Sequence, residues 1–139
     1  MEIPAELYKE IIKRGAVLIG AFTGIDHKKF FVVAGESGEM AGYFFINSNI
    51  NSFVQSNKSF MDLQMPIKRS CYPSFLTHDS FIDAHELRKA HKSTLAKQLT
   101  SGKIAYRGML SADDLEQLLE GLRSSPVYKK VDKDTFFKP

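Results

Sequence analysis

Short apolar runs separated by tight polar turns are the feature that most constrains the fold of this chain. The first three runs cover residues 16–22, 30–34 and 43–46, and both intervening turns contain glycine. Neither turn has room for a helix, whereas parallel neighbours need a crossover of about a dozen residues or more. The three runs are therefore predicted to form a meander, in an antiparallel sheet or a small barrel.

Three more strand-like segments follow, at residues 60–67, 76–84 and 103–110. Proline has no amide hydrogen for a neighbouring strand, so Pro66 is expected at an edge of the sheet. The chain is thus predicted to be mainly β, with helices added to give an α+β fold.

Two helices are predicted beside these strands. Residues 1–14 carry an apolar stripe and end at Gly15, which is a natural helix stop. This helix is either a packed cap or an arm that binds a partner. Residues 92–99 form a second short helix that ends near Gly102.

The clearest helix signal begins at Ser111. This residue is a good N-cap, two carboxylates follow it, and leucines recur at helical spacing as far as Leu122. Residues 125–139 are interpreted as a tail in which Lys alternates with Asp before Phe136 and Phe137.

Size and composition exclude several classes of protein. The 139 residues, at 15.7 kDa, suit a single domain over residues 1–139. Eleven Phe and five Tyr supply too much apolar surface for a disordered chain, and no apolar run reaches the roughly 20 residues that span a bilayer. Cys71 is the lone cysteine, and the N-terminus lacks the apolar core of a signal peptide, so a cytoplasmic location is predicted.

The charge balance permits a nucleic-acid partner without requiring one. Lys and Arg number 19 against 16 acidic residues, and the pI is about 8.9. The chain has no phosphate-binding loop, dinucleotide fingerprint, zinc-type cysteine pair or HExxH motif. Its four histidines lack helical i, i+4 pairing, so neither a metal nor a cofactor is expected.

Polar residues cluster at three strand ends, at positions 27–29, 47–49 and 78–85. Each cluster has a structural interpretation: a solvated turn, turn-forming side chains and a polar strand edge. Strand alternation predicts His78 and Ser80 on one face of the sheet and Asp83 on the other.

In order along the chain, these elements resemble the MazF/PemK-type toxins of bacterial toxin–antitoxin systems, which are small SH3-like barrels acting as ribonucleases. Residues 79–83 (DSFID) are similar to the family's "DSYVD"-type strand, and residues 102–115 to the strand that leads into its closing helix. Residues 15–22 resemble its opening strand. The resemblance covers residues 15–124 and implies a small antiparallel SH3-like barrel with a C-terminal closing helix.

The resemblance also implies a metal-independent endoribonuclease that acts on single-stranded RNA. The family's Lys-Arg-Pro segment matches Lys28-Lys29, which keeps the positive charge without an arginine. The expected catalytic residues are Lys28 as the cation, Ser48 orienting the phosphate, and His78 and Asp83 as acid–base groups. The expected RNA-binding residues are His27, Lys29, Asn49, Phe53 and Tyr72.

The implied partners are single-stranded RNA, a cognate antitoxin protein and a second copy of the chain, in a bacterial or phage-encoded system. One alternative is a catalytically inactive barrel that binds a protein or nucleic acid on the same groove. Another is a domain of a phage or mobile-element protein without a toxin role. Convergence of Lys28, Ser48 and one of His27, His78 or Asp83 on one concave surface would favour the enzyme.

Overall fold

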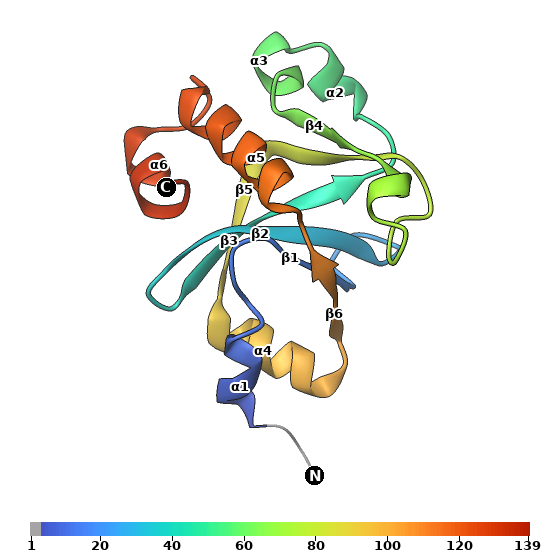
Figure 1. Ribbon diagram of the computed structural model, residues 1–139, viewed down its shortest axis with the longest axis vertical. Helices are drawn as coiled ribbons and strands as arrows, with labels where there is room; N and C mark the ends of the chain where they lie inside the picture. The colour runs from blue at the N-terminus through green and yellow to red at the C-terminus, as the bar shows by residue number, and fades with distance from the viewer. Residues whose placement is uncertain (1–3) are drawn as a thin grey trace.

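One antiparallel sheet, in the order β4-β5-β3-β2-β1-β6, organises the part of the chain that the computed structural model describes, residues 4–139 (Figure 1). The strands are β1 (Ala16–Gly20), β2 (Lys29–Ser37), β3 (Met40–Asn47), β4 (Gln64–Ile67), β5 (Ser80–His91) and β6 (Ile104–Met109). β1, β2 and β3 form the predicted meander, and Pro66 lies in the edge strand β4. The prediction of a mainly β, α+β fold is confirmed.

Helices cover both faces of the sheet. In Figure 1, α1 (Ala5–Lys9) and α4 (Lys92–Ser101) lie below it, and α5 (Ala112–Ser124) and α6 (Lys130–Phe136) lie above it. Two one-turn helices, α2 (Ser52–Gln55) and α3 (Lys58–Met61), precede β4, and a 3₁₀ turn, η1 (Arg69–Cys71), follows it. No helix within residues 4–139 is long and apolar enough to cross a membrane.

The chain therefore has two apolar cores, one on each face of the sheet. Val17, Val32 and Phe44 point toward α5 and α6, while their neighbours Leu18 and Phe31 point toward α4. This two-sided burial explains why the strands read as continuous apolar runs rather than alternating ones.

Most predicted helices are confirmed, with shifted ends. The N-terminal helix was expected over residues 1–14, the first three of which lie outside the described residues, and α1 ends at Lys9. The Ser111 hydroxyl accepts a hydrogen bond from the Asp114 amide at 3.2 Å, which caps α5. Gly102 ends α4 in the left-handed conformation, at φ 79°.

The expected SH3-like barrel is wrong in its closure. Within residues 4–139, β4 pairs only with β5 and β6 only with β1, so the sheet keeps two open edges. A closed barrel buries one face of its strands inside itself. Here both faces are apolar and each is covered by helices, so burial is achieved without closure.

The interpretation of residues 125–139 as a tail is also incomplete. Lys130–Phe136 form α6, and Phe136 and Phe137 are 4% and 0% exposed in the core beside α5. Two arginines hold this segment: Arg14 donates to the Phe136 carbonyl at 2.8 Å, and Arg123 donates to the Phe137 carbonyl at 3.0 Å.

Candidate functional site

A pocket of about 240 Å³ opens at one end of the sheet. It lies where the loop between β1 and β2, the end of β3 and the segment before β5 meet, because antiparallel register brings these three strand ends together. Phe30 pairs with Ile46, and Ile46 pairs with Ile82. The lining residues are His27, Lys28, Lys29, Phe30, Ile46, Ser48, Leu76, Thr77, His78 and Ser80.

Four of the expected functional residues border this pocket with exposed side chains. Lys28 and His27 come from the first hairpin loop, Ser48 follows β3, and His78 precedes β5. Phe30, from β2, contributes an apolar side chain to the lining. The structure thus brings together groups that lie up to 51 positions apart in the sequence.

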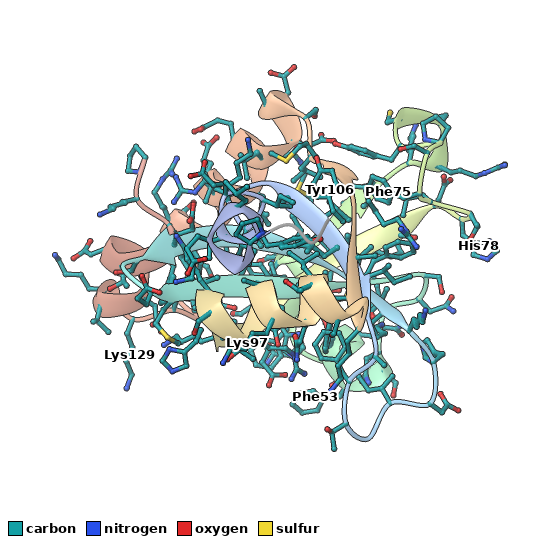
Figure 2. All side chains as sticks on the ribbon, turned by 90° about the horizontal axis from the view of Figure 1, so that it is seen from below. Phe53, Phe75, His78, Lys97, Tyr106 and Lys129 are labelled. Carbon is teal, nitrogen blue, oxygen red and sulfur yellow. The ribbon has the colours of Figure 1, made fainter. Side chains whose placement is uncertain are left out.

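Local contacts position the two histidines. The Ser80 hydroxyl donates to the His78 carbonyl at 3.0 Å and ties the segment to the start of β5. In the loop between β1 and β2, His27 Nδ1 lies 2.9 Å from an Asp26 carboxylate oxygen, and this hydrogen bond lowers the pKa of Asp26. Figure 2 shows His78 at the periphery of the molecule, where its ring is open to solvent.

Asp83, expected as an acid–base group, lies apart from this pocket. Asp83 lies opposite Phe45 in the sheet, on the face away from Ile46, and it does not line the pocket. It accepts hydrogen bonds from Gln64 at 2.7 Å and from Asn47 at 3.3 Å, and it also pairs with His85 Nδ1. Its side chain is 15% exposed.

Lys29 joins the pocket to this second group of residues. Its ammonium donates to the Asn47 side-chain oxygen and lies 5.5 Å from the centre of the Phe45 ring. Burial lowers the pKa of Lys29; the Asp83 carboxylate opposes this effect and the Arg88 guanidinium adds to it. We call Lys29, Asn47, Gln64, Asp83 and His85, all of them half-buried, the half-buried polar network.

A second, more open hollow of about 300 Å³ adjoins the pocket and shares Lys29 and Ser48 with it. Its remaining lining residues are Asn47, Asn49, Ile50 and Asn51. Asn49 therefore lies beside the pocket rather than in it. We call the two hollows together the depression, and their lining residues reach from His78 to Asn51, the residue that caps α2.

The two aromatic residues among the expected RNA-binding residues have opposite placements. Phe53 in α2 is 65% exposed. Tyr72 is 6% exposed, its hydroxyl donates to the Asp114 carboxylate, and the Ser111 amide donates to that hydroxyl at 3.0 Å. Burial and the Asp114 contact raise the pKa of Tyr72. Tyr72 thus anchors the start of α5, and its ring has no free face for a base.

Asn47 and His85 belong to the polar clusters seen in the sequence but are assigned no role there, and Gln64 is not singled out at all. The pairing of His85 with Asp83 has a sequence signal, because residues two apart in a strand share a face. Gln64 has none: it meets Asp83 only through the pairing of β4 with β5.

Among residues 4–139 no group of three or more His, Cys, Asp or Glu side chains could hold a metal ion. Cys71 is a free, exposed thiol. No family model matches this chain, and no curated protein matches it in sequence.

Proposed function

We propose that this protein is a metal-independent endoribonuclease of the toxin type that acts on single-stranded RNA. The observation that carries the proposal is the convergence of Lys28, Ser48, His27 and His78 around one open pocket. Two imidazoles, a cation and a hydroxyl are a sufficient set of groups for cleaving RNA through its own 2′-hydroxyl.

In the proposed reaction, one imidazole accepts the proton of the 2′-hydroxyl, and the 2′-oxygen attacks the adjacent phosphorus. The bond from phosphorus to the 5′-oxygen breaks, and the other imidazolium donates a proton to that oxygen. The products are a 2′,3′-cyclic phosphate and a 5′-hydroxyl. His27 and His78 are the two imidazoles, and histidine is the side chain that most often serves as a general acid or base.

Lys28 supplies the positive charge that stabilises the phosphorane in the transition state, and Ser48 orients the phosphate by donating a hydrogen bond. Asn49 and Lys29, in the adjoining hollow, bind the neighbouring part of the strand. Single-stranded RNA is the proposed substrate because in-line attack requires a nucleotide that is free to leave the stacked helix.

The resemblance of residues 79–83 and 102–115 to toxin motifs supports the biological part of the proposal. The protein acts in the cytoplasm of a bacterium, from a bacterial or phage gene, as a homodimer. A cognate antitoxin protein neutralises it. Expression without that antitoxin is expected to arrest growth.

Substitution of the pocket residues tests the proposal. Lys28→Ala is expected to abolish cleavage of an unstructured RNA in the presence of a metal chelator, and His78→Ala to reduce the rate by about 10² to 10⁴-fold. Lys97→Ala is the matched control, since Lys97 is an exposed lysine on α4, away from His78 (Figure 2). Equal activity of Lys28→Ala and Lys97→Ala would contradict the proposal.

A second candidate function is non-catalytic binding of RNA or a protein at the same depression. The observation that favours it is the pair Lys28-Lys29 where the related motif has Lys-Arg-Pro, since lysine lacks the bidentate fork of arginine. RNA binding without cleavage by folded protein would select this alternative.

A further inference from the structure

Three rings form a row beside the candidate site. The Phe53 and Phe60 ring centres lie 5.8 Å apart, and the Phe60 and His85 ring centres lie 5.0 Å apart. The row begins at an exposed ring in α2, passes through α3 and ends at an imidazole on β5. We call it the ring row.

Phe53 is exposed although its helix is anchored. The next residue, Val54, is 1% exposed and fixes α2 to the molecule, so Phe53 is held on the outside. The Asn51 side chain accepts from the Phe53 amide at 2.7 Å, and the Asn57 side chain accepts from the Phe60 amide at 3.1 Å. Each one-turn helix therefore has an asparagine cap, and the two outer rings project from a defined backbone.

His85 closes the row at a fixed orientation. Its Nδ1 pairs with Asp83, and that carboxylate is also held by Gln64 and Asn47. The side chain of His85 is 17% exposed. The half-buried polar network thus supports the inner ring, and Phe53 is the ring with a face free for a ligand.

The ring row begins in the helix that follows the second hollow, and its three rings line neither hollow. The second hollow shares Lys29 and Ser48 with the pocket and reaches Asn51, the residue that caps α2. Lys29 and Arg88 lie 5.5 Å and 4.4 Å from the centre of the Phe45 ring, on the face of the sheet that also carries Asp83 and His85. Aromatic faces beside cations are the combination that binds single-stranded nucleic acid.

We propose that the ring row is a nucleobase-stacking subsite for a nucleotide that flanks the one held in the pocket. The inference rests on the proposed function, because it assigns a second position to the same RNA substrate. Stacking on Phe53 accepts any of the four bases, so the subsite contributes affinity rather than sequence choice.

The test uses a fluorescent 2′-O-methyl oligonucleotide of mixed sequence, which has no 2′-hydroxyl and cannot be cleaved by the proposed route. A second oligonucleotide of the same length carries abasic positions throughout. Phe53→Ala is expected to weaken binding of the first about tenfold and to leave binding of the second unchanged. Phe53→Tyr keeps the ring and is expected to bind as the wild type does. Val131→Ala is the matched control, since both Val131 and Phe53 are 65% exposed.

The outcomes separate the subsite from the activity. If the wild type cleaves RNA but Phe53→Ala binds the base-bearing oligonucleotide as tightly as Val131→Ala does, the subsite is overturned and the endoribonuclease stands. If Phe53 instead contacts a protein partner, Phe53→Ala is likewise expected to leave binding of the oligonucleotide unchanged. If the folded wild type neither binds nor cleaves RNA, the subsite and the proposed function are both overturned.

Discussion

Gly35 in β2 has no space for a side chain. A β-carbon built on it would lie 1.8 Å from the carbonyl oxygen of Phe136, which is backbone and cannot turn aside. Gly35→Ala is therefore expected to lower the free energy of unfolding by about 2 to 3 kcal/mol, through overpacking between β2 and α6.

Chemical denaturation of Gly35→Ala beside Gly121→Ala measures this effect. Gly121 is in α5, and nothing lies within 4 Å of a β-carbon there, so its replacement is expected to stabilise by about 0.5 to 1 kcal/mol. Similar changes at the two glycines would show that Phe136 does not pack against β2 as described.

Tyr128 makes the free energy of unfolding fall as pH rises in the alkaline range. Its hydroxyl donates to the Ala84 carbonyl at 2.7 Å, and burial, with smaller contributions from Asp83, Asp132 and Glu86, raises its pKa well above the ordinary value. Above pH of about 10 the unfolded chain loses this proton while the folded chain keeps it, so stability is lost as pH rises.

Tyr128→Phe is accordingly expected to cost about 1 kcal/mol at neutral pH, through the lost hydrogen bond. The difference from wild type should shrink above pH of about 10, because phenylalanine does not ionise. Urea unfolding at both pH values measures it. A difference that grows with pH would contradict the assigned environment of Tyr128.

At the residue scale, the sequence predicted those parts of the site that depend on strand ends. Lys28, Ser48 and His78 each follow or precede an apolar run, and antiparallel pairing brings such ends together. Tyr72 could not be predicted in this way. Its burial depends on Ser111 and Asp114, which are 39 and 42 positions away.

The C-terminal helix α6 is an element that packing creates. Seven residues are too few to hold a helix in water alone, so Lys130–Phe136 gives no sequence signal comparable to that of α5. Phe137 packs against Phe44 and Tyr128, with ring centres 6.1 Å and 5.1 Å away. These contacts explain why residues 125–139 belong to the core rather than to a tail.

Phe137→Ala is expected to destabilise the protein by about 3 to 5 kcal/mol, because it leaves a cavity between β3 and α6. Val131→Ala, an exposed change on α6, should stay within about 0.5 kcal/mol of wild type. Thermal unfolding of both variants tests the packing of the segment, and equal melting temperatures would show that Phe137 is not in the core.

At the scale of the whole molecule, the apolar pattern of the sequence predicted the antiparallel meander and its helices. It did not predict that the sheet stays open. Whether β4 and β6 meet depends on how far the sheet curls, and apolar runs carry no information on curvature. The strands here are apolar on both sides, which is compatible with a barrel that has outer helices and with a sheet between two helical layers.

The number of cations that contact phosphates determines how strongly salt affects RNA binding. If Lys28, Lys29 and Arg88 are the cations that meet phosphates, a plot of log affinity against log salt should have a slope of about −2. Fluorescence anisotropy at several salt concentrations measures the slope. A much steeper dependence would place the RNA along other basic residues of the surface.

The most direct test of the account is cleavage of a labelled single-stranded RNA by folded protein in a metal chelator, beside the same strand with every 2′-hydroxyl methylated. The account predicts that the RNA is cut to products ending in a 2′,3′-cyclic phosphate and a 5′-hydroxyl, and that the methylated strand stays whole. Intact RNA at high protein concentration, or cutting of both strands, would contradict it.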